Sequence, residues 1–147
     1  MSKIRGALLA IAIVALSALP AGASVGNFDL RPAAGGEKAA GEVVVTDVFE
    51  GGYEIKEISV EASGLEPYSV YTVWLAKERP AGDFRGLGIG DHAFKTDGEG
   101  KGRFVTTLNS YDYMGYDYLQ VALHPDDNPE NLDNAVVALT GDLEKIW

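Results

Sequence analysis

SVYTVWLA, residues 69–76, is the stretch of sequence that decides the fold class. Its β-branched and aromatic residues favour a β-strand. Successive side chains of a strand point to opposite faces. One face consists of Tyr71, Val73 and Leu75, and the other consists of Val70, Thr72 and Trp74. Both faces are largely apolar, which predicts a central strand covered on both sides.

The same period-two pattern recurs on either side of this strand, separated by Gly, Pro and Asp turn signals. The further predicted strands are 25–31, 42–49, 53–62, 92–96, 101–108, 118–124 and 135–143. In segment 53–62 the inward apolar set changes phase between Ile55 and Ile58, which predicts a β-bulge near Lys56 and Glu57. Seven to eight short strands with no helical periodicity predict an all-β fold, an antiparallel Greek-key β-sandwich of the immunoglobulin-like type.

The first 23 residues have the three parts of a secretory signal peptide. Lys3 and Arg5 form a basic start, residues 6–19 are almost wholly apolar, and a small-residue cleavage site follows at 21–23. A retained membrane anchor and a prepilin leader with its peptidase site at Arg5-Gly6 are the alternatives. The predicted organisation is therefore a signal peptide (1–23), an N-terminal extended segment and Gly-rich loop (24–41) and a β-sandwich domain (42–147). The extended segment could pair within its own sheet or with the edge of a neighbour.

Composition excludes several classes of function. All 22 Asp and Glu residues follow residue 23, whereas two of the twelve Lys and Arg residues precede it, so the net charge without residues 1–23 is −12. Such a domain is a poor candidate for binding nucleic acid or an anionic membrane, because both need clustered cations. The absence of cysteine excludes disulfides, Cys-ligated metal sites and a catalytic thiol.

A loose pattern of turn glycines and core residues extends over nearly the whole chain after residue 23. It comprises Leu30, Gly41, GLxPxSxY (64–71), FxTDxxGxGxF (94–104) and LxGxL (139–143). This pattern resembles the secreted Greek-key sandwiches grouped around Cu/Zn superoxide dismutase and the CHRD domain. In the dismutases the strand after the Gly-Leu-x-Pro turn carries metal-binding histidines, whereas Tyr71–Leu75 here carries none. The resemblance therefore implies the fold but not the redox activity.

The two histidines are expected to lie at opposite ends of the sandwich, because loops between sequential antiparallel strands alternate between ends. His92 begins a predicted strand and His124 finishes one. A strand of five to seven residues is roughly 17–20 Å long. We therefore expect each histidine to be a hydrogen-bonded residue near a strand end rather than half of a shared metal site.

One of the two loop ends is rich in the side chains that are enriched at binding surfaces. The candidate contact residues there are Arg79, Phe84, Arg85, Tyr111, Tyr113 and Tyr116. They could bind a protein, a glycan or a second copy of the chain. The alternative is that their rings cover the end of the core.

The other loop end is acidic, and its loop 125–134 carries oxygen ligands at alternate positions, Asp126, Asn128 and Glu130. Ca²⁺ takes ligands of this kind. The loop lacks the central Gly and final Glu of an EF-hand, however, and a solvated loop held by Asx turns is the alternative.

Motifs of catalysis are missing, since the chain contains neither Gly-x-Ser-x-Gly nor His-Glu-x-x-His. The predicted function is a secreted or cell-surface, non-enzymatic binding or structural module with no cofactor, apart from a Ca²⁺ ion in one alternative. The other functions considered are a metal-dependent oxidoreductase of the dismutase type and a Ca²⁺-stabilised adhesin.

Overall fold

The computed structural model describes residues 24–33, 38–79, 81–109 and 111–143, and over these residues the protein contains strands and no α-helix. The predicted all-β class is confirmed. The strands, all paired antiparallel, are β1 (Ser24–Pro32), β2 (Ala40–Glu50), β3 (Tyr53–Ser63), β4 (Val70–Ala76), β5 (Phe84–Gly86), β6 (Ala93–Lys95), β7 (Gly102–Leu108), β8 (Tyr118–His124) and β9 (Val136–Asp142). The predicted signal peptide lies outside the described residues.

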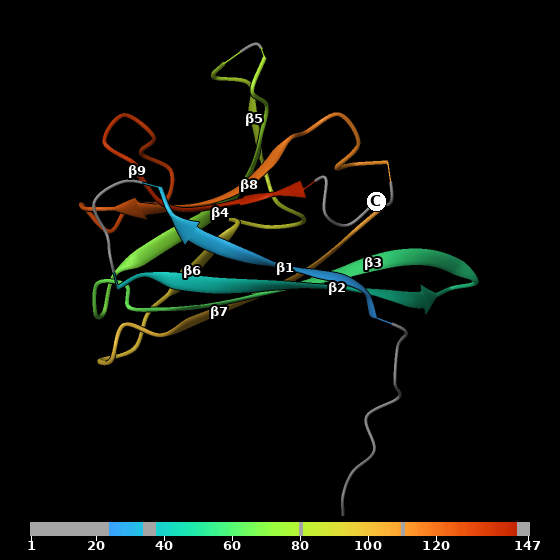
Figure 1. Ribbon diagram of the computed structural model, residues 1–147, viewed down its shortest axis with the longest axis horizontal. Helices are drawn as coiled ribbons and strands as arrows, with labels where there is room; N and C mark the ends of the chain where they lie inside the picture. The colour runs from blue at the N-terminus through green and yellow to red at the C-terminus, as the bar shows by residue number, and fades with distance from the viewer. Residues whose placement is uncertain (1–23, 34–37, 80, 110, 144–147) are drawn as a thin grey trace, which may run out of the picture.

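The strands form one curled sheet in the order β5-β4-β8-β9-β1-β2-β3-β7. β6 also pairs with β4, at residues 70–72, whereas β5 pairs with β4 at residues 74–76. β1 joins the two halves of the sheet, because residues up to Leu30 pair with β2 whereas Arg31 and Pro32 pair with β9 (Figure 1). Segment 24–32 therefore pairs within the chain's own sheet, between β9 and β2.

The concave side of the curled sheet holds the core. Val43 and Val60 come from one half of the sheet, and Val73, Val121 and Leu139 come from the other, all in one buried cluster. The two predicted faces of segment 69–76 differ in burial, since Tyr71, Val73 and Leu75 are all buried whereas Val70 and Trp74 are only partly buried. Complete burial of each such side chain is worth about 1.5–3 kcal/mol.

The β-bulge predicted near Lys56 and Glu57 is wrong. β2 and β3 pair without a register shift from Ala40 opposite Ser63 to Glu50 opposite Tyr53. Lys56 occupies the inward position that an apolar residue would normally fill, and its ammonium group is paired with Asp47 and with Glu54. The apparent change of phase is therefore a partly buried ion pair and not an extra residue.

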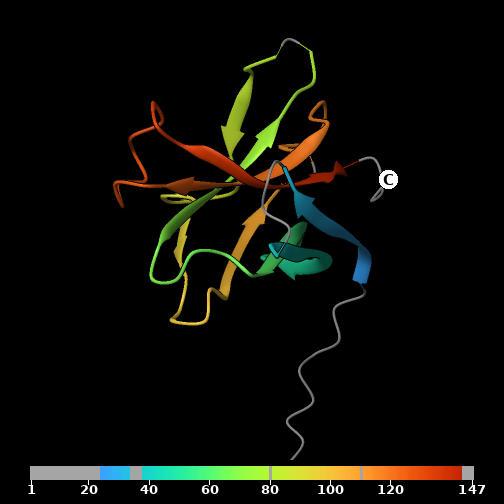
Figure 2. The ribbon, with the colours of Figure 1, turned by 60° about the vertical axis from the view of Figure 1, so that its left-hand side comes forward.

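Segment 77–91, in which the sequence predicts no strand, contains β5, which pairs with the end of β4 to form a projecting hairpin (Figure 2). β5 and β6 together run antiparallel to β4, and residues 87–92 separate them. β5 is only three residues long and contains Gly86, so neither its length nor its composition marks it as a strand.

Candidate binding groove on the outer face of β4

The six candidate contact residues do not form one surface. Tyr113 is 4% exposed within the core cluster. Tyr116 packs partly buried against the same cluster, with the Lys77 ammonium group 5.2 Å from its ring centroid. These two tyrosines therefore cover the end of the core, as in the alternative interpretation, whereas Tyr111 is 83% exposed.

The remaining three candidates lie on the β4–β5 hairpin. Arg79 is exposed. Arg85 Nη1 donates to Asp112 Oδ1 at 3.2 Å, and both residues line a hollow of about 290 Å³ between β5 and β7. Phe84 projects to the outer face of β4, where its ring meets Trp74 edge to face at 5.3 Å between centroids. Of the six, only Phe84 belongs to the groove described below.

The expectation that the two histidines lie at opposite ends of the fold is wrong. The carbonyl oxygen of His92 accepts a hydrogen bond from Val73 N at 2.9 Å, beside the middle of β4. His124, fully buried, places Nε2 2.7 Å from Thr72 Oγ1 of the same strand. The sequence did not predict this proximity because it did not predict β5. Both β5 and β6 pair with β4, and the segment between them, 87–92, places His92 beside Val73.

The acidic loop that follows β8 uses its candidate calcium ligands largely for its own turns. Asp126 Oδ1 accepts from Asn128 N at 3.1 Å, and Asp126 Oδ2 accepts from Asn131 Nδ2 at 2.6 Å. Asn128 Oδ1 accepts from Glu130 N at 3.1 Å. The hydrogen bond from Asn131, followed by the one from Asn128, lowers the pKa of Asp126 below its ordinary value. Within the described ranges no three His, Asp or Glu side chains are placed to hold a metal ion together.

Trp74 is the centre of the candidate site. Its side chain is only half-buried on the outer face of β4, although the sequence predicted that both faces of this strand are covered. Nε1 donates to Thr72 Oγ1 at 2.7 Å, which fixes the direction of the indole along the strand. Phe84 and His92 contact the same indole, the His92 ring at 5.9 Å between centroids. The fixed indole is therefore preorganised as a contact surface.

Two hollows meet at Trp74, and together we call them the Trp74 groove. The larger, about 480 Å³, is lined by Trp74, Asp91, His92, Asn128, Pro129, Glu130 and Leu132. The smaller, about 160 Å³, is lined by Trp74, Phe84, Gln120, Ala122, Leu132, Ala135 and Val137. Residues 128–135 of the acidic loop thus form one wall of the groove, opposite residues 91 and 92.

Backbone strain is present at the edge of this groove. His92 has a φ of 57°, in the left-handed region that non-glycine residues seldom adopt. Its Nδ1 lies 2.8 Å from the carbonyl oxygen of Leu87, which can only accept, so Nδ1 carries a proton. The ring rests on Gly86, where an added Cβ would lie 2.1 Å from His92 Cδ2. Strain of this kind is found disproportionately at functional sites.

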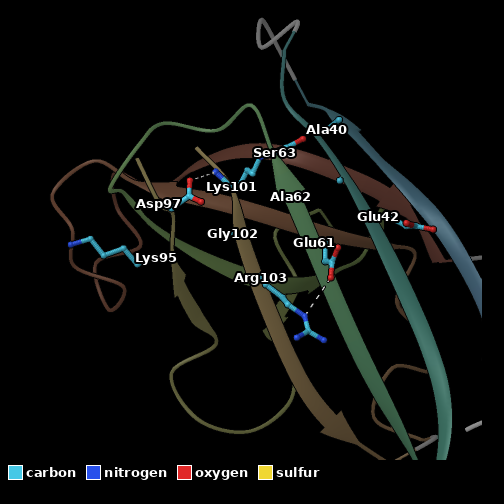
Figure 3. Close-up of a pocket in the computed structure, with 11 residues that line it drawn as sticks. Ala40, Glu42, Glu61, Ala62, Ser63, Lys95, Asp97, Lys101, Gly102 and Arg103 are labelled. Carbon is cyan, nitrogen blue, oxygen red and sulfur yellow. Dashed lines mark hydrogen bonds and ion pairs between the residues drawn. The ribbon is translucent and has the colours of Figure 1, made fainter. Parts of the chain in front are cut away.

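A third hollow, of about 630 Å³, lies where β2, β3 and β7 meet near the turn 97–100 (Figure 3). One ion pair and one hydrogen bond to the backbone join its charged residues. Arg103 Nε lies 3.4 Å from Glu61 Oε1, and Asp97 Oδ1 accepts from Lys101 N at 2.9 Å. No aromatic side chain lines it, so it offers a ligand less preorganised apolar surface than the Trp74 groove does.

Comparisons of the chain with protein-family models, with curated proteins and with solved structures find no match. Among the described residues there is no helix with the length and apolarity that crossing a bilayer demands.

The sequence did not predict that Trp74, His92 and residues 128–135 share one site, although it marked Asn128 and Glu130 as candidate calcium ligands. One signal was available, because Thr72 is a polar residue on the otherwise apolar outer face of the predicted central strand. A hydroxyl at that position needs a partner if it is buried. Its partners are Trp74, which lines both hollows, and the buried His124 beneath the outer face.

Proposed function

We propose that the protein is a secreted, non-enzymatic binding module that holds an extracellular ligand in the Trp74 groove. The observation that carries this proposal is the Trp74 indole, which is fixed by Thr72, flanked by Phe84 and His92, and shared by two adjoining hollows. Concave sites with aromatic walls and a few polar groups are the usual form of ligand pockets.

We also propose that the curled sheet is a Greek-key sandwich of the type suggested by the resemblance to the superoxide dismutase and CHRD group. The neighbours that are distant in sequence, β3 beside β7, β4 beside β8 and β9 beside β1, support it. The strand order of this chain can be compared with the strand orders in determined structures of that group. The same order would support the proposal, and a different order throughout the group would contradict it.

Screening on glycan and peptide arrays tests the proposed site. Wild-type protein and a Leu132→Ala variant are compared, because Leu132 lines both hollows and is 42% exposed, so its truncation costs little stability. We expect the strongest wild-type ligands to bind the variant at least about threefold more weakly. Equal binding of all ligands to both proteins would contradict the site.

Two further measurements test the other parts of the proposal. N-terminal sequencing of the exported protein should give Ser24 as the first residue, and an intact Met1 in the exported protein would contradict signal cleavage. Mass spectrometry of a ligand after prolonged incubation should return it unchanged. Conversion of the ligand by the wild type that is lost in the Leu132→Ala variant would contradict the non-enzymatic assignment.

A further inference from the structure

The larger hollow of the Trp74 groove combines an aromatic side chain with two carboxylates, one of which, Asp91, accepts a hydrogen bond from Ala93 N at 3.2 Å. Asp91 and Glu130 both line it with Trp74, and no Lys or Arg side chain does. Neither carboxylate takes part in an ion pair within the described part of the chain. A cation in this hollow would gain charge-assisted hydrogen bonds from the carboxylates and the attraction of the indole face, which is the strongest of the aromatic side chains for cations.

The smaller hollow is complementary to an apolar group. Phe84, Ala122, Leu132 and Val137 are among its lining residues. Its volume of about 160 Å³ is close to that of an apolar cavity, roughly 150 Å³, that holds benzene. A branched aliphatic or aromatic side chain therefore fits.

Because Trp74 and Leu132 line both hollows, the cationic and apolar groups must lie close together on the same ligand. In an extended peptide, residues two apart point to the same side and are separated by roughly 6.5–7 Å. A net charge of −12 without residues 1–23 would also draw a cationic ligand toward this protein.

We propose that the ligand is an extracellular peptide segment with Lys or Arg two residues from an apolar side chain, the cation lying between Trp74, Asp91 and Glu130. This inference rests on the proposed function, since it names the ligand class of the same groove. Lys95 lines an adjoining hollow together with Asp91 and Pro129, so its charge opposes the binding of a cation there.

The test uses the peptide acetyl-Gly-Lys-Ser-Leu-Gly-amide and three matched peptides, titrated by isothermal calorimetry into the full secreted chain. In the matched peptides the lysine is acetylated, the lysine is replaced by Glu, or the leucine is replaced by Ser. We expect acetylation to weaken binding by about tenfold or more, the scale of a lost charge-assisted hydrogen bond. The peptide with Glu in place of lysine should bind more weakly than the acetylated peptide. The peptide with Ser in place of leucine should bind about fivefold more weakly than the lysine peptide.

Variants of the protein separate the groove from general charge attraction. Glu130→Gln and Asp91→Asn should each weaken binding of the lysine peptide about three- to tenfold, and neither should change binding of the acetylated peptide. Asp133→Asn is the matched control, because it removes one charge from the same loop but lines neither hollow. Lys95→Gln should tighten binding by up to about threefold.

The outcomes distinguish the ligand class from the site. Equal affinity for the lysine and acetylated peptides, or equal effects of Glu130→Gln and Asp133→Asn, would overturn the cationic class. If array ligands without a cation still lose affinity in Leu132→Ala, the proposed function stands while this inference fails. If Leu132→Ala affects no ligand of any kind, both fail.

Discussion

Thr72 Oγ1 lies 2.7 Å from His124 Nε2 across the outer face of β4 and β8, and both side chains are buried. The same hydroxyl oxygen accepts Trp74 Nε1–H at 2.7 Å, and His124 Nδ1 lies 3.1 Å from the carbonyl oxygen of Asn131. Because a carbonyl can only accept, Nδ1 donates and Thr72 donates its hydroxyl proton to Nε2. One threonine thus connects the indole of the groove to the loop that forms the groove's wall.

Replacing Thr72 with Val tests this connection, since the change keeps the shape and removes the hydroxyl group. We expect a loss of about 2–3 kcal/mol in the free energy of unfolding, because the buried imidazole and the indole N–H lose their shared partner. Chemical denaturation measures it. Thr46→Val, on the outer face of β2, is the matched control and should stay within about 0.5 kcal/mol. Equal losses in the two variants would show that the hydroxyl group of Thr72 contributes no more to the free energy of unfolding than that of Thr46.

The strain at His92 can be measured by comparing two substitutions at that residue. His92→Gly should be more stable than His92→Ala by about 1 kcal/mol, because only glycine adopts a φ of 57° without steric cost. At the neighbouring Ala93, within β6, the order should reverse, and Gly should be less stable by about 0.5–1 kcal/mol. Thermal or chemical unfolding of the three variants gives both differences. Greater stability of the alanine variant at residue 92 would contradict the left-handed conformation.

The buried Lys56 predicts a specific loss of stability in alkali. Hydrogen bonding to Asp47 chiefly raises the pKa of Lys56 above its ordinary 10.5, although burial opposes the shift. A lysine whose pKa is raised by folding stabilises the folded chain below its unfolded pKa, and this contribution is lost as the pH rises through the folded value.

Free energies of unfolding of wild type and Lys56→Met, measured between pH 7 and pH 12, test this pH dependence. Their difference should be constant up to about pH 10.5 and should change above it as the wild type loses the ion pair. Lys101→Met, at an exposed residue, controls for the loss of one charge. A difference between wild type and Lys56→Met that does not change with pH would mean that the Lys56–Asp47 pair contributes nothing.

Calcium should leave the stability of the fold unchanged, because both carboxylate oxygens of Asp126 already accept hydrogen bonds within the loop. Melting temperatures of chelator-treated protein with and without millimolar Ca²⁺ provide the measurement. A rise of several degrees that disappears in Asp126→Asn would contradict this interpretation and restore the calcium-stabilised adhesin.

Much of the fold follows from local sequence pattern. Segment 69–76 contains strand β4, with Tyr71, Val73 and Leu75 on one face, as predicted. The alternation of loops between the two ends also holds for turns 63–68 and 97–100, which are joined by hydrogen bonds from Leu65 N to Gly100 O and from Tyr68 N to Asp97 O. Period-two alternation specifies which side chains point inward, and strand reversal specifies which turns share an end. Neither depends on distant residues.

The misplaced features depend on contacts between residues that are distant in sequence. Lys56 looks like an interruption of the inward pattern until Asp47 is opposite it in β2. Trp74 looks like a residue covered on a two-sided strand, yet the loop after β8 leaves it beside open hollows. Tyr113 looks like a contact residue, but the curl of the sheet buries it.

The most direct test of the Trp74 groove is to map the strongest array ligand onto the protein by ¹H–¹⁵N NMR. The Trp147→Phe variant leaves the indole N–H of Trp74 as the single tryptophan side-chain signal. We expect the largest shifts at that signal and at the amides of residues 91–93, 128 and 130–132. Shifts confined to residues 109–117, with the indole signal unmoved, would contradict the groove and favour the loop end that carries Tyr111.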